Sequence, residues 1–97
     1  MSQVKRCQCD RYIYDDEAGM SPLNKPATLT FEIYWRKVAG EEPYQSEFQI
    51  VDCECIRIDD GEYRNPTLSE NTNISRWFME LIQLDECLHE RIQEEIG

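Results

Sequence analysis

The chain has 97 residues, 40% of them hydrophobic, and its 20 acidic against 10 basic residues give a net charge of −10 and a pI near 4.4. A chain of this length has material for one hydrophobic core, so residues 1–97 are expected to form a single domain. The acidic excess argues against direct nucleic-acid binding, which needs lysine and arginine to displace the counterions of phosphates, and equally against binding to anionic membranes.

Residues 4–14 alternate between two sets of side chains and predict a β-strand. One face would carry Cys7, Cys9 and Ile13, and the other Tyr12 and Tyr14. Both sets are largely apolar, so both faces of this strand are expected to be at least partly covered. Residues 15–27 are rich in aspartate, glycine and proline, which predicts a loop.

Residues 28–38 have the clearest alternation of the chain and predict a second strand. Its apolar face would carry Leu29, Phe31, Ile33 and Trp35. The glycine, glutamates and proline of residues 39–45 are typical of a hairpin connection.

Residues 46–58 predict a third strand, but the phase of its apolar residues changes along it. Phe48, Ile50, Ile56 and Ile58 share one face, whereas Val51, Cys53 and Cys55 share the other. Either a β-bulge near Val51 or a strand covered on both faces would explain this pattern. Residues 59–62 form a turn signal, and Pro66 would end any fourth strand that begins at Tyr63.

The last quarter of the chain predicts one long helix, with Asn73 as its N-cap and Gly97 at its end. Its apolar stripe consists of Ile74, Trp77, Phe78, Leu81, Leu84, Leu88, Ile92 and Ile96. The expected fold is therefore α+β, with three or four antiparallel strands and one long C-terminal helix packed on one face. In such a meander the first and third connections lie at the same end of the sheet, and Glu41 and Glu42 lie at the other end.

The spacing of four cysteines suggests a zinc site as one alternative. Cys7 and Cys9 are separated by one residue, as are Cys53 and Cys55. Residues at positions i and i+2 of a strand stand about 6.6 Å apart along it, which is awkward for two ligands of one ion. Cysteine also packs as a small hydrophobe, so we expect core packing, free thiols and no cofactor.

No motif in the sequence indicates catalysis, and we expect the protein not to be an enzyme. His89 is the only histidine, there is no phosphate-binding glycine-rich loop, and the paired carboxylates fall in turns rather than in apolar pockets. The N-terminus lacks the apolar run of a signal peptide, and the five cysteines suit a reducing compartment, so a cytoplasmic location is expected.

The acidic residues are the remaining candidates for a binding site. Three of them, Glu86, Glu90 and Glu94, would place one carboxylate about every 6 Å along the helix. The predicted partner-binding residues are Asp15, Asp16, Glu17, Glu41, Glu42, Asp59, Asp60, Glu62, Glu86, Glu90 and Glu94. Such a surface would suit a basic protein or nucleoprotein complex.

The small size, the acidic excess, and clusters such as Asp15-Asp16-Glu17 and Asp59-Asp60-Gly61-Glu62 resemble the small acidic inhibitor proteins of phages and mobile elements. That class includes DNA mimics and some anti-CRISPR proteins. The resemblance implies a protein that mimics DNA or RNA and inhibits a nucleic-acid-binding complex, such as a CRISPR effector or a restriction enzyme. The alternatives are a protein–protein interaction module without mimicry and a small zinc-stabilised domain.

Overall fold

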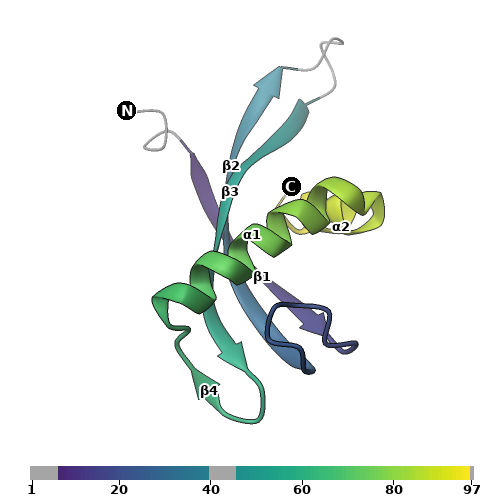
Figure 1. Cartoon of the computed structure of the whole chain (residues 1–97). Helices are drawn as coiled ribbons and strands as arrows, with labels where there is room; N and C mark the ends of the chain where they lie inside the picture. The colour runs from purple at the N-terminus through teal and green to yellow at the C-terminus, as the bar shows by residue number, and fades with distance from the viewer. Residues whose placement is uncertain (1–6, 40–45, 97) are drawn as a thin grey trace.

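The computed structural model describes residues 7–39 and 46–96 and confirms the α+β fold class (Figure 1). The fourth strand is present, although it has only two residues. The elements in chain order are β1 (Gln8–Asp16), β2 (Ala27–Ala39), β3 (Ser46–Asp59), β4 (Tyr63–Arg64), α1 (Leu68–Leu84) and α2 (Glu86–Ile96).

The four strands form an antiparallel meander in the order β1-β2-β3-β4. Both helices pack on the same side of this sheet, and one continuous core joins the two layers (Figure 1). The opposite face of the sheet is covered by no described element, and we call it the open face. The molecule is therefore a flat, two-layered body of 46 × 30 × 18 Å.

The central strand β2 buries the apolar face that its alternation predicts. Leu29, Phe31, Ile33 and Trp35 are all buried. The ring of Phe31 stacks on that of Phe78 in α1, with ring centroids 3.8 Å apart and planes 8° from parallel. This stacked pair joins the sheet to the helix layer at the centre of the core.

Two β-bulges in β3 explain the change of phase in its sequence. The register passes from Arg57 opposite Thr30 to Cys55 opposite Phe31, and from Asp52 opposite Tyr34 to Ile50 opposite Trp35. Ile56 and Val51 are therefore the additional residues of the two irregularities. Of the two explanations left open by the sequence, the bulge near Val51 is correct, because the bulges keep Ile50, Cys53, Cys55 and Ile58 on the helix side while the other face of β3 stays open.

The prediction that both faces of β1 are covered is wrong. Tyr12 is buried and Tyr14 is half-buried against α1, where its ring meets the edges of Phe78 and Trp77 at centroid distances of 5.3 and 6.0 Å. Ile13 lies on the open face and is 65% exposed. The two tyrosines have the larger apolar area, so they take the face that the helices cover.

The helical region differs from the prediction at its start. Thr67, not Asn73, is the N-cap, and Asn73 lies within α1. The Thr67 hydroxyl accepts a hydrogen bond from the Glu70 amide at 3.2 Å, and the Glu70 carboxylate accepts one from the Thr67 amide at 3.0 Å. This capping box is readable in the sequence as Thr-x-x-Glu directly before the helix.

The predicted single helix is also divided in two at Asp85. Its backbone is extended, with φ −108° and ψ 99°, and its amide closes α1 by donating to the Leu81 carbonyl at 2.8 Å. Its carboxylate accepts hydrogen bonds from the amides of Cys87 at 3.0 Å and Leu88 at 3.2 Å, so it also caps α2. The break takes Leu84 out of the apolar stripe and leaves it 84% exposed. The predicted end at Gly97 lies outside the described residues.

Candidate functional site

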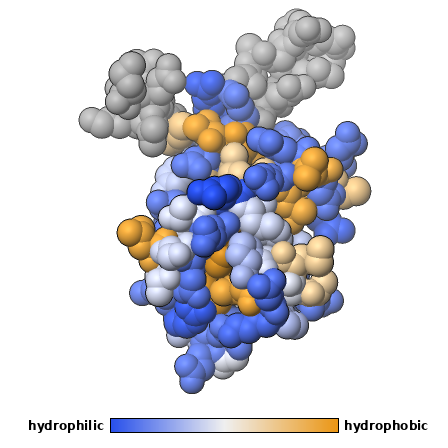
Figure 2. Space-filling view, in the orientation of Figure 1, coloured by the Kyte–Doolittle hydropathy of each residue, from blue (hydrophilic) through white to orange (hydrophobic). Residues whose placement is uncertain are grey.

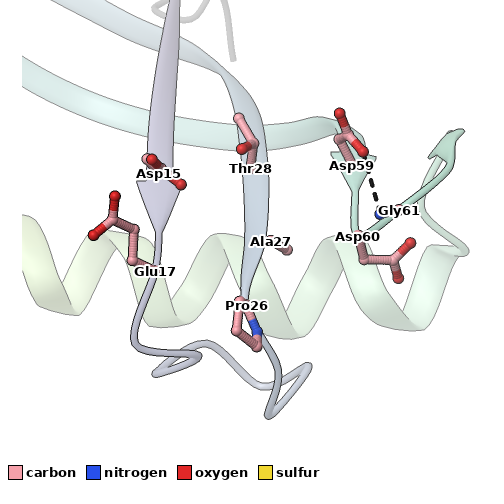
Figure 3. A pocket seen from close by; sticks show the side chains of 8 residues that line it. All are labelled: Asp15, Glu17, Pro26, Ala27, Thr28, Asp59, Asp60 and Gly61. Carbon is pink, nitrogen blue, oxygen red and sulfur yellow. Dashed lines mark hydrogen bonds between the residues drawn. The ribbon is translucent and has the colours of Figure 1, made fainter.

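The first and third connections meet at one end of the sheet, as the meander predicts, and form a wide, shallow hollow of about 560 Å³. Figure 3 shows Asp15 and Glu17 on one side of the start of β2, and Asp59 and Asp60 on the other. We call this site the acidic hollow. It is lined by Asp15, Glu17, Pro26, Ala27, Thr28, Asp59, Asp60 and Gly61, so four lining residues are acidic and none is basic.

The register of three neighbouring strands sets the position of two of these carboxylates. Asp15 of β1 lies opposite Thr28 of β2, which lies opposite Asp59 of β3. Neighbouring strands are about 4.8 Å apart, so the backbones of the two aspartates are separated by about 10 Å across Thr28. Sequence reasoning did not identify Thr28, because a threonine becomes part of a site only when the register places carboxylates on both sides of it.

Asp60 takes part in ion pairs that hold this end of the molecule together. Its carboxylate lies 3.0 Å from Lys25 Nζ and 3.3 Å from the Arg64 guanidinium. The hydrogen bond from Lys25, supported by that from Arg64, lowers the pKa of Asp60. Arg64 also binds Glu70 of α1 at 2.7 Å. The negative charge of Asp60 is thus compensated by two bases, which makes this residue an anchor rather than a free acidic group.

Asp16 cannot contact a partner, contrary to the prediction, because it is only 2% exposed. Its two carboxylate oxygens accept hydrogen bonds from the amides of Met20 at 2.9 Å and Ser21 at 3.0 Å. Gly19 completes this loop with φ +67°, and a Cβ at that position would meet the carbonyl carbon of Lys25 at 2.9 Å. The role of Asp16 is therefore to shape the loop that carries Glu17 into the hollow.

The other predicted site residues lie elsewhere. Glu62 is exposed in the turn but does not line the hollow. Glu86, Glu90 and Glu94 are exposed along α2, and we call them the α2 stripe. Glu41 and Glu42 lie outside the described residues.

The acidic hollow and the α2 stripe are two surfaces, since no α2 residue lines the hollow. Tyr14 belongs to β1, and its hydroxyl is close enough to Asp85, the residue before α2, to be affected by its charge. Burial raises the pKa of its hydroxyl, and the nearby charges of Asp16 and Asp85 raise it further. On the helix side of the molecule the surface is largely hydrophilic, and its apolar patches are small and separated (Figure 2).

The alternative of a zinc site on Cys7, Cys9, Cys53 and Cys55 is not supported, because Cys9 lies on the open face of the sheet whereas Cys53 and Cys55 are buried on its helix side. Cys9 is exposed on the open face, where its thiol donates to the Glu32 carboxylate at 3.1 Å. Cys53 and Cys55 are buried on the helix side, and the Cys53 thiol donates to the Ser75 carbonyl at 3.4 Å. Burial raises the pKa of Cys53 to about 12 and that of Cys55 to about 11. Within residues 7–39 and 46–96, no three His, Cys, Asp or Glu residues are grouped so as to hold a metal ion.

Neither of the described helices is long and apolar enough to cross a membrane. Comparisons of the chain with protein-family models, with curated proteins and with solved structures found no match.

Proposed function

We propose that this chain is an acidic binding protein that occupies the nucleic-acid groove of a basic partner and blocks the entry of DNA or RNA. The partner would be a nucleic-acid-handling protein or nucleoprotein complex, such as a CRISPR effector or a restriction enzyme. The observation that carries the proposal is the acidic hollow, where four carboxylates and no basic residue line one surface of a chain with net charge −10.

Three residues of the hollow have charge to offer a partner. Asp15, Glu17 and Asp59 form no ion pair with any lysine or arginine that the structure describes. A charge without a nearby counter-ion attracts a basic surface at longer range and speeds the encounter with it. Asp16 and Asp60 are committed to the loop and to the ion pairs, so their contribution is to hold the other three in place.

The spacing of the carboxylates supports a comparison with a phosphate backbone. Phosphates along one DNA strand advance by about 3.4 Å of helix axis each, so two and three steps advance by about 7 and 10 Å. The α2 stripe repeats about every 6 Å, and the backbones that carry the Asp15 and Asp59 carboxylates are separated by about 10 Å. Lysine and arginine side chains that bind phosphates at such intervals could bind these carboxylates in the same way.

The test is competition on the captured partner. The protein is used to capture its partner from the native host, and labelled DNA or RNA is then titrated against it. We expect mutual loss of affinity, and a complex that weakens with salt because the screening length falls from about 10 Å at 0.1 M to about 3 Å at 1 M. If nucleic acid and protein bind together without mutual loss, the mimicry proposal is wrong.

A matched pair of variants separates the position of the charges from their number. In one variant Glu17 and Asp59 are replaced with lysine; in the control, Glu54 and Glu80, which are exposed away from the hollow, are replaced with lysine. Both variants change the net charge equally. We expect the first to slow association with the partner much more than the control does, whereas equal effects would show that net charge alone matters.

A second candidate function, a protein–protein interaction module without mimicry, is favoured by the open face. This face carries Ile13, which is 65% exposed, and Tyr63, which is 70% exposed. Arg57 lies over the Tyr63 ring at 5.5 Å from its centroid, so the surface is mixed in charge as well as partly apolar. A complex that tolerates high salt, and that Ile13→Lys disrupts while the Glu17/Asp59 variant does not, would favour this candidate.

A further inference from the structure

The strand β1 forms one margin of the sheet. It pairs with β2 along its full length of nine residues, and no register shift interrupts the pairing. In a marginal strand, alternate amide and carbonyl groups point away from the neighbouring strand. A flat margin of this kind is a template for pairing with a further strand.

The margin on the side of β3 is protected by three features. Two bulges distort β3, and β4 covers its end at Ile58 and Asp59. Side chains of α1 also reach over the strand, because the Cys55 amide donates to Asn71 Oδ1 at 3.1 Å and to Ser75 Oγ at 3.0 Å. These features discourage the addition of a strand at β3, which leaves β1 as the margin suited to pairing.

The open-face side chains of β1 are complementary to those of a second copy of the same strand. Arg11, Ile13 and Asp15 are exposed and follow one another at two-residue spacing on this face. In an antiparallel pair centred on Ile13, the two isoleucines lie opposite each other, and Arg11 of each copy lies opposite Asp15 of the other. Opposite charges and apolar side chains placed directly across two strands stabilise their pairing.

We propose that this protein forms a symmetric dimer in which the β1 strands of two copies pair antiparallel about Ile13, giving one continuous sheet. The pairing explains the exposed isoleucine on an otherwise polar margin. A two-residue shift of register places Ile13 opposite either Arg11 or Asp15 and loses the complementary set. A one-residue shift places the open face of one copy beside the helix side of the other.

The net charge of −10 on each chain opposes the association, so the salt concentration of the test matters. At about 0.15 M salt the screening length is about 8 Å. Side chains opposite each other across two strands have Cβ atoms about 4.5–5.5 Å apart, inside that length, whereas most other charges of the two copies are further apart. Asp10 and Asp16 would face each other on the helix side, where Asp10 already accepts a hydrogen bond from Trp35 Nε1 at 2.6 Å.

A charge exchange tests the register. The dissociation constant of the dimer is measured by sedimentation equilibrium for the unmodified chain, for Arg11→Asp, and for the double variant Arg11→Asp with Asp15→Arg. We expect the single variant to raise this constant about tenfold or more, because the symmetric dimer contains the Arg11–Asp15 pair twice and loses both. The double variant should return the constant to within about threefold of that of the unmodified chain. Arg57→Asp is the matched control, because Arg57 lies on the same face two strands away from the margin.

Disulfide trapping tests the same geometry independently of charge. Cys9 and Cys87 are exposed and are first replaced with serine. Ile13→Cys should then give a disulfide-linked dimer under mild oxidation, because residues opposite each other lie within the distance a disulfide spans. Thr30→Cys, its neighbour on β2, should not, because the two copies of Thr30 would be about 14 Å apart.

A chain that stays monomeric at all concentrations, a double variant without recovery, or equal cross-linking of Thr30→Cys would each overturn the proposal. The dimer and the proposed function share one residue, because Asp15 lines the acidic hollow and would also pair with Arg11 of the other copy. Arg11→Asp leaves every carboxylate of the acidic hollow in place, so the loss of the dimer and the loss of partner binding can be told apart.

Discussion

Replacing Phe78 with alanine tests how the helix layer is attached to the sheet. Phe78 has no exposed area, and its ring stacks on Phe31 with centroids 3.8 Å apart while the ring of Tyr14 meets it edge-on at 5.3 Å. Deleting a buried phenylalanine side chain costs about 3–5 kcal/mol. We expect the upper part of this range, because aromatic pairs contribute about 0.5–1.5 kcal/mol beyond the area they bury.

The assay is urea denaturation followed by tryptophan fluorescence, with Leu84→Ala as the control. Both residues lie in α1 and both are apolar, but Leu84 is 84% exposed, so its loss should change the free energy of unfolding by less than about 0.5 kcal/mol. The whole domain is expected to have a stability of about 5–15 kcal/mol. The Phe78 variant should therefore lose a large part of its stability, with a clearly lower denaturation midpoint.

Equal midpoints for the two variants would refute the docking of α1 through Phe78. A double-mutant cycle with Phe31→Leu and Phe78→Leu then isolates the stacked pair. We expect a coupling energy of about 0.5–1.5 kcal/mol between the two positions. Additive effects would show that the rings do not interact beyond their separate burial.

Three further predictions concern the ion pair, the helix junction and the thiols. The hydrogen bond from Arg64 lowers the pKa of Glu70 from 4.5 to about 2. The ionised Glu70 carboxylate therefore stabilises the fold above about pH 4.5, and this contribution is lost as the pH falls towards 2. In Glu70→Gln, the free energy of unfolding measured against pH should decrease less between about pH 4.5 and pH 2 than in the unmodified chain. Asp85→Ala should cost about 0.5–2 kcal/mol in chemical denaturation and Asp85→Asn much less, because asparagine keeps the capping oxygen; equal costs would contradict the capping role. Mass spectrometry after brief alkylation at neutral pH should show Cys87 labelled and Cys53 protected, since Cys53 is buried and its pKa is raised to about 12; rapid labelling of Cys53 in the folded protein would contradict its burial.

Local pattern was enough where the apolar residues of an element are confined to one face. The alternation of β2 predicts its buried face correctly, because side chains of a strand alternate strictly between its two sides. Ile74, Phe78, Leu88 and Ile92 recur at helical spacing and are all buried. The meander also places Asp15 near Asp59, because antiparallel hairpins return the chain to the same end of the sheet.

Local pattern was not enough where two assignments satisfy it equally. In β1, both faces are apolar enough to be buried, and the choice depends on where the helices pack. In β3, the position of the bulges follows from the register with β2 and not from β3 alone. The break at Asp85 depends on a carboxylate that reaches the amides of Cys87 and Leu88, in a stretch whose helical periodicity continues on both sides.

The function of individual acidic residues was also decided by the tertiary structure. Composition determines that the chain is strongly acidic, because charge is a sum over residues and does not depend on where they lie. Whether a given carboxylate is available to a partner depends on its neighbours in space. Asp15, Asp16 and Asp60 are alike in sequence, yet one is open to solvent, one is buried against backbone amides and one is paired with two bases. Those neighbours come from distant parts of the chain, so only the packed fold brings them together.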